Sequence, residues 1–156
     1  MEIIIIVLGI ILDRVTKLWA IKRLSIGEDI VIIKDFFSFS YLENRGAAFG
    51  IFKDKQLFLI SITMVAILLM MFYLFINKTN PKILKISLSL IISGAIGNLI
   101  DRIKYRYVVD FIFFHYKDKY HFPIFNIADV LVSLGTILLI IFIIKEDGYE
   151  DRRIFS

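Results

Sequence analysis

Four long apolar stretches alternate with polar segments along the chain. The most uniform of them runs from Leu57 to Ile76 without a single charged residue. A helix needs about 20 such residues to cross the hydrocarbon core of a bilayer. We therefore expect an all-α membrane protein, a four-transmembrane-helix bundle that forms a single domain over residues 1–156. The expected spans are at about residues 2–21, 57–76, 83–100 and 127–144.

The first apolar stretch is the least regular of the four. Its apolar run, Ile3 to Leu12, is followed directly by Asp13, Arg14 and, after two more residues, Lys17. A secretory signal peptide is the competing interpretation. However, Glu2 stands where a signal peptide carries basic residues, and no small-residue cleavage site follows the run. We expect a spanning helix whose second half is polar on one face.

Two long loops, at about residues 22–56 and 101–126, separate the spans, and a tight basic turn, NKTNPK, joins the second span to the third. Because successive spans alternate in direction, both long loops lie on the same side of the membrane. The first loop contains DIVIIKDFFSFSYL, whose β-branched and aromatic residues predict short strands. The basic turn favours its own side as the cytoplasmic one, with both termini inside.

This topology gathers polar residues from distant parts of the sequence at one end of the bundle. Residues three and four positions apart share a face of a helix, so the polar residues of each span form a stripe. The stripes are Gly9, Asp13 and Lys17, then Gly94, Asn98 and Asp101, then Asn126, Asp129, Ser133 and Thr136. Asn44 and Asp110 belong to the two loops at the same end.

Composition narrows the chemistry that these residues could perform. The chain is 58% hydrophobic and has no cysteine, which excludes disulfides, thiol nucleophiles and thiolate metal sites. His115 and His121, the only histidines, match no metal-ligand spacing, and Ser93 lacks the motif of a serine hydrolase. The net charge of +4 fits contact with anionic membrane lipids. No arginine-rich arm or aromatic-basic platform indicates nucleic acid.

Carboxylates are the catalytic groups that remain. Two carboxyls that share a site cannot both ionise cheaply, so one of them retains a proton. Such a pair can activate a water with one member and protonate the substrate with the other. Asp101, Asp110 and Asp129 are the candidates. Each also has a simpler interpretation, respectively as an ion pair with Arg102, as a charge at a strand edge and as a carboxylate that favours a helix N-terminus.

Five motifs resemble those of the lipoprotein signal peptidase family, also called signal peptidase II, and they are spread over nearly the whole chain. They are DRVTK (13–17), ENRGAAFG (43–50), GAIGNLIDR (94–102), VVDF (108–111) and FNIAD (125–129). The resemblance implies a protease of the bacterial cytoplasmic membrane with both termini in the cytoplasm. It also implies an active site near the extracytoplasmic face, a small β-sheet (a cradle) from the first loop, and a flap over the site after Asp110.

The resemblance further implies roles for individual residues. Asp110 and Asp129 would be the catalytic pair. Substrate-binding or supporting residues would be Asp13, Lys17, Asn44, Gly46, Asn98, Asp101, Arg102 and Asn126. The substrates implied are diacylglyceryl-modified prolipoproteins, cut just before the lipidated cysteine, with no metal or organic cofactor. Membrane lipids are the other partners, and we expect a monomer.

Two further classes of function fit part of the pattern. In a small transporter or channel, Asp13, Asp101 and Asp129 would relay protons or cations. In a non-catalytic membrane scaffold, these aspartates would tolerate replacement by asparagine. The uncharged second span and the apolar end of the fourth, ILLIIFII, argue against a polar path through the whole membrane.

Overall fold

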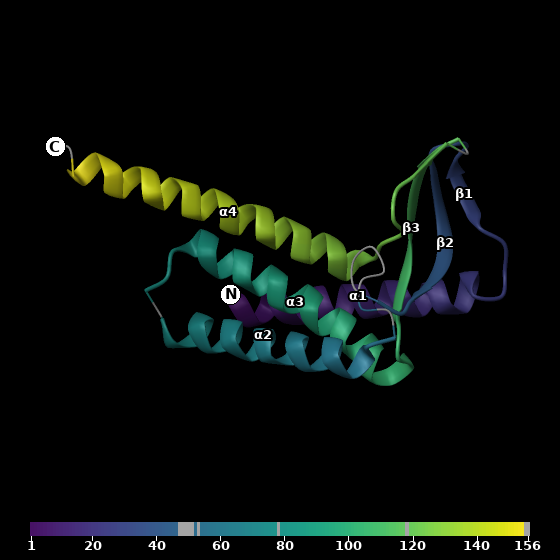
Figure 1. Cartoon of the computed structure of the whole chain (residues 1–156), viewed down its shortest axis with the longest axis horizontal. Coiled ribbons are helices and arrows are strands. Elements are labelled where there is room, and N and C mark those ends of the chain that lie inside the picture. The colour runs from purple at the N-terminus through teal and green to yellow at the C-terminus, as the bar shows by residue number, and fades with distance from the viewer. Residues whose placement is uncertain (47–51, 53, 78, 118, 155–156) are drawn as a thin grey trace.

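Four helices lie roughly along one direction, and a small sheet stands across one end of them (Figure 1). The computed structural model describes residues 1–46, 52, 54–77, 79–117 and 119–154. Within these residues the helices are α1 (Glu2–Leu24), α2 (Gln56–Ile76), α3 (Lys82–Tyr105) and α4 (Ile127–Ile154). The strands are β1 (Ile30–Ile33), β2 (Phe37–Asn44), β3 (Val108–Tyr116) and β4 (Tyr120–His121). A mostly helical membrane protein with a small antiparallel sheet is therefore confirmed.

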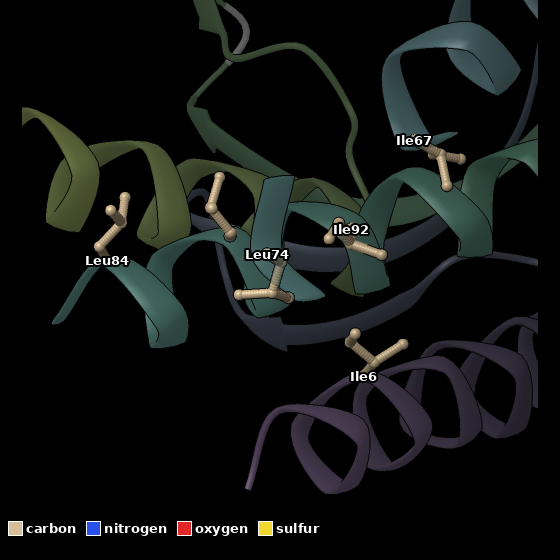
Figure 2. Packing of buried hydrophobic residues seen from close by; sticks show 6 residues of the cluster. Ile6, Ile67, Leu74, Leu84 and Ile92 are labelled. Atoms are coloured by element: carbon tan, nitrogen blue, oxygen red, sulfur yellow. The ribbon is translucent and has the colours of Figure 1, made fainter. Parts of the chain in front are cut away.

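Helix α3 is the centre of the bundle and packs against α1, α2 and α4. Its buried apolar side chains join those of α1 and α2 in one cluster, part of which Figure 2 shows. Ile92 is fully buried at the middle of α3, and Ile6 of α1 and Ile67 of α2 belong to the same cluster. This packing fixes the helix whose C-terminal end carries Asn98, Asp101 and Arg102.

Three helices are long and apolar enough to cross a membrane among the residues described, namely α2, α3 and the part of α4 from Ile127 to Glu146. The outward side chains of α2 are apolar, as lipid requires: Leu68, Leu69 and Phe72 are 60%, 64% and 67% exposed. Helix α1 has a comparable length of 23 residues but carries charges at its middle.

Three of the expected spans end earlier than the helices that contain them, and the first of these helices, α1, continues past residue 21 to Leu24. Helix α3 continues past residue 100 to Tyr105, and Arg106 then ends it in the left-handed conformation with φ of 66°. Helix α4 continues past residue 144 to Ile154. A span is recognised by its apolar length, whereas Lys, Glu and Arg also favour a helix in water. Apolar length therefore marks the membrane segment and not the end of the helix.

The four strands are antiparallel and lie in the order β1-β2-β3-β4. The strands expected in the first loop are confirmed as β1 and β2. The second loop also forms strands, and the chain after Asp110 continues as β3 to Tyr116. Its Phe-rich sequence fits a half-buried strand, and pairing with β2 satisfies its backbone hydrogen bonds.

The sheet is held against α1 by a second apolar cluster. Ala20 and Leu24 of α1 pack there with Val109 and Phe111 of β3. Trp19 of α1 adds an edge-to-face contact with Phe111, with ring centroids 6.1 Å apart. Strand β3 is thereby fixed relative to the bundle at the point where it carries Asp110.

Close packing of α4 on α3 depends on Gly135. A Cβ at this position would lie 2.7 Å from both the Ser87 carbonyl oxygen and Ile91 Cγ1. We expect Gly135→Ala to destabilise the protein by about 1–3 kcal/mol because the helices must move apart. Thermal unfolding in detergent micelles measures this. Ile137→Ala on the exposed face of the same helix is the control, and an equal fall in Tm for both variants would contradict the prediction.

Candidate active site

A pocket of about 330 Å³ lies where the ends of α3 and α4 meet the sheet. Both polar and apolar side chains line it, which suits a site at the boundary between water and lipid. The polar lining residues are Asn44, Asn98, Arg102, Asp110, Asp129 and Ser133. The apolar ones are Val108, Phe122, Pro123, Ile124, Phe125 and Val132.

Asp110 reaches the pocket from strand β3 and is only 1% exposed. Its Oδ1 accepts a hydrogen bond from Asn126 Nδ2 at 2.6 Å, and its Oδ2 accepts one from Asn44 Nδ2 at 2.9 Å. Burial, and then the nearby charge of Asp129, raise the pKa of Asp110 to about 7, although the two amide bonds act in the opposite direction. Asp110 can therefore carry a proton near neutral pH.

Asp129 lies in the first turn of α4 and forms a reciprocal cap with Asn126. The Asp129 backbone N–H donates to Asn126 Oδ1 at 3.0 Å, and the Asn126 backbone N–H donates to Asp129 Oδ2 at 3.1 Å. Asp129 Oδ1 also accepts a hydrogen bond from Asn98 Nδ2 at 2.8 Å. The expectation of a carboxylate that favours a helix N-terminus is thus met, and Asp129 nonetheless faces the pocket.

Asn126 connects the two carboxyls directly. Its side-chain amide donates to Asp110 and its backbone N–H donates to Asp129, and the residue is fully buried. The two aspartates come from different elements, but both are hydrogen-bonded to Asn126 and both line one pocket. This arrangement has the geometry in which two carboxyls share a site.

A buried ion cluster lies behind the pocket. Lys17 Nζ lies 3.0 Å from Asp13 Oδ2 and 3.0 Å from Asp101 Oδ2, and all three side chains are fully buried. Asp13 Oδ1 also accepts the backbone N–H of Ala128 at 3.0 Å, and Asp101 Oδ2 accepts that of Val109 at 3.1 Å. Asp13 and Asp101 thus tie the start of α4 and the start of β3 to the bundle.

The ion-pair partners of Asp101 in the structure differ from the one that the sequence suggested. The sequence suggested an ion pair with its neighbour Arg102, whereas Asp101 pairs with Lys17 and with Arg14 Nη1. Residues adjacent on a helix point in different directions, so Arg102 instead faces the pocket. There its Nη2 donates to the Gly46 carbonyl oxygen at 3.1 Å.

The end of β2 and the residues after it bond to the pocket residues Asp110 and Arg102 through Asn44 and Gly46. The Gly46 backbone N–H donates to Asn44 Oδ1 at 3.0 Å, which leaves the amide nitrogen of Asn44 for Asp110. The rest of this motif, residues 47–50, lies outside the described residues. Every site residue proposed from the sequence thus lines the pocket or contacts a residue that lines it, except Asp13 and Asp101, which are linked to it through Lys17.

Sequence reasoning missed two groups of contributors. Arg14 was in a quoted motif, but nothing in the sequence indicated its bond to Asp101, 87 positions away. Residues 122–125 line the apolar part of the pocket, and although the resemblance implied a flap after Asp110, only Phe125 of these four stood in a quoted motif. His115 and His121 lie opposite each other on β3 and β4 and are not among the residues that line this pocket.

Comparison with known proteins identifies the family of this chain. The family profile described as Signal peptidase (SPase) II matches residues 5–145. The chain belongs to the signal peptidase II family. It is 99% identical to a lipoprotein signal peptidase of Clostridium tetani over the full length of both chains. It is 56% identical to one of Clostridium novyi, over 94% of this chain and 99% of the relative.

Solved structures give the same picture of the family fold. Two structures of bacterial membrane enzymes, obtained by the in meso method, resemble the chain. One has a TM-score of 0.84 at 35% identity and covers 95% of this chain and 90% of its own. The other has a TM-score of 0.80 at 36% identity and covers 92% of each chain.

The electrostatic contact between the two carboxyls can be tested without an activity assay. We expect Asp129→Asn to lower the pKa of Asp110, because it removes a neighbouring negative charge that disfavours ionisation. Infrared titration of the carboxyl stretch, with isotope-labelled aspartate, measures the midpoint. Glu43→Gln removes an exposed acid on β2 and is the control. An Asp110 midpoint that is unchanged by Asp129→Asn would show that the two groups do not interact.

Proposed function

We propose that this chain is an aspartic endopeptidase that removes signal peptides from diacylglyceryl-modified prolipoproteins by cutting before the lipidated cysteine. The observation that carries this proposal is the shared pocket of Asp110 and Asp129, with the pKa of Asp110 raised to about 7. Its relatives are named lipoprotein signal peptidases, which gives the substrate class.

In the proposed mechanism the two aspartates have different roles because their surroundings differ. Asp110 is buried and protonated, and acts as the acid. Asp129 accepts two N–H hydrogen bonds and acts as the base. It takes a proton from water while the resulting hydroxide adds to the scissile carbonyl, and Asp110 gives its proton to the carbonyl oxygen. When the carbonyl reforms, the oxygen returns its proton to Asp110 and Asp129 gives the other to the leaving amine.

The remaining lining residues would bind and orient the substrate. Arg102 presents a cation on the polar side of the pocket, where it can bind a peptide carbonyl. The apolar side, with Phe122, Phe125 and Val132, suits the hydrocarbon part of a lipidated substrate. Site chemistry and lipid binding would therefore take place side by side.

We further propose that α1 is the fourth membrane span. Its charged residues Asp13 and Lys17 are fully buried in the bundle. The opposite face is apolar and open, with Ile4, Leu8 and Val15 60–64% exposed. A hydropathy average counts the charges, but lipid would contact only the apolar face.

The proposed orientation puts both termini in the cytoplasm and the pocket near the extracytoplasmic face of the cytoplasmic membrane. Both ends of the chain lie away from the sheet in Figure 1, which supports this arrangement. The start of α3, which carries Lys82 and Lys85, lies at the end opposite the sheet (Figure 1). We propose that the protein acts as a monomer.

Replacement of either proposed catalytic residue tests the function. Asp110→Asn and Asp129→Asn should each reduce cleavage of a purified diacylated precursor by at least about 100-fold, because each removes acid–base catalysis. Mass mapping of the product locates the cut, and thermal unfolding confirms that the variants fold. Asp29→Asn, an exposed acid in the loop after α1, should cleave normally. Full activity in either dyad variant would rule out the aspartic mechanism.

The proposed role of Asp110 also predicts a pH dependence. Since Asp110 must be protonated and its pKa is about 7, kcat/KM should fall as the pH rises through about 7. Below a pH of about 7 Asp110 keeps its proton, so its titration does not lower kcat/KM there. Initial rates in mixed micelles, taken between about pH 5 and about pH 9, give this pH profile. A rate that stays constant up to pH 9 would exclude Asp110 as the acid.

A further inference from the structure

Three asparagines are hydrogen-bonded to Asp110 or Asp129, and two of them are oriented by backbone groups that can only donate. Asn44 Oδ1 accepts the Gly46 N–H at 3.0 Å, and its amide nitrogen therefore faces Asp110. Asn126 Oδ1 accepts the Asp129 N–H at 3.0 Å, and its amide nitrogen likewise faces Asp110. Because a backbone N–H cannot accept a hydrogen bond, neither amide can turn its oxygen toward the carboxylate without losing that bond.

The third asparagine, Asn98, follows the same rule with a side chain as the donor. Its Oδ1 accepts from Lys17 Nζ at 2.8 Å, and its Nδ2 donates to Asp129 Oδ1 at 2.8 Å. An ammonium group has three donors and no acceptor, so it also fixes the direction of the amide. Lys17 is thus the one member of this set of donors that a substitution can remove.

We propose that Lys17 is a positioning residue that orients the Asn98 amide toward Asp129. This inference rests on the proposed function, since Asp129 is the base there. If the amide turned over, its oxygen would face a carboxylate oxygen at 2.8 Å, and the two acceptors would repel each other. Lys17 excludes that orientation and so keeps Asp129 in place for the attack by water.

The position of the ammonium is itself firmly set. Lys17 is fully buried, and besides Asn98 it contacts Asp13 Oδ2 and Asp101 Oδ2, each at 3.0 Å. The two carboxylates pair with the ammonium by charge, and Asn98 Oδ1 accepts a hydrogen bond from it. Lys17 does not line the pocket, so it acts on Asp129 only through Asn98. Its loss should therefore lower kcat and leave KM unchanged.

The expected loss is partial because Asn98 has a second donor. Asn126 Nδ2 donates a hydrogen bond to Asn98 Oδ1 at 3.2 Å, and the same nitrogen donates a second one to Asp110 Oδ1 at 2.6 Å. That longer bond retains part of the orientation. Removing the donor at position 17 should thus cost about tenfold in kcat, which is the usual effect of one hydrogen bond.

Two substitutions at the same position separate the hydrogen bond from the charge. Lys17→Gln and Lys17→Met both remove the positive charge and have similar length, but only glutamine keeps an N–H donor for Asn98. We expect kcat of the glutamine variant to exceed that of the methionine variant by about tenfold, with equal KM. A merely structural role for the buried charge would lower the activity of both variants alike, and equal kcat values would overturn the proposal.

Loss of the buried cation could prevent folding, because Asp13 and Asp101 would lose a partner. Both substitutions are therefore repeated with Asp13→Asn, which restores the balance of buried charge. Side-chain amide NMR with labelled asparagine gives a second readout that does not need activity. The Asn98 amide protons should exchange faster with water in the methionine variant, and equal exchange in the two would also overturn the proposal.

Failure of this proposal can be distinguished from failure of the proposed function. Retained cleavage by Asp129→Asn would remove the function itself. A chain that cleaves the precursor, loses this activity in Asp129→Asn and shows the same kcat for both substitutions at Lys17 would keep the function and lose only the role of Lys17.

Discussion

The burial of one ammonium group is the constraint on which the rest of the structure depends. Lys17 is shielded completely from solvent, and an unpaired charge there would be strongly destabilising. Its partners Asp13 and Asp101 also hold the backbone N–H groups of Ala128 and Val109, which begin α4 and β3. Satisfying one cation therefore places the two segments that carry Asp129 and Asp110. The pocket is a consequence of that pairing.

The pocket gives two identical side chains different surroundings. Asp110 lies on a strand, is almost completely buried and has a pKa of about 7. Asp129 lies at the start of a helix, partly exposed, where N–H groups and the helix dipole favour a negative charge. Asn126 contacts both and keeps them at a fixed separation. In the proposed mechanism the different roles of acid and base follow from these different surroundings.

The sequence predicts whatever depends on local pattern. Apolar length located α2 and α3, β-branched and aromatic residues located β1 and β2, and the polar stripes brought Asp13, Asn98 and Asp129 to one end. Contacts between distant positions were not predictable. Helical spacing indicated the pair of Asp13 with Lys17, but the bonds of Lys17 to Asp101 and Asn98 depend on how α1 packs against α3. A strand at Asp110 was only one of its two interpretations, and its pairing was not predictable because its partner β2 lies some 70 positions earlier in the chain.

The distance in sequence between Lys17 and its partners matters for how the protein is made. In the proposed topology α1 enters the membrane while Asn98 and Asp101, 81 and 84 positions after Lys17, have still to leave the ribosome. Until then the counter-ion available to Lys17 is Asp13, on the same helix. The nascent helix must therefore wait with its charged face toward water, headgroups or the insertion machinery. The helix can take its final position only after α3 has been inserted beside it.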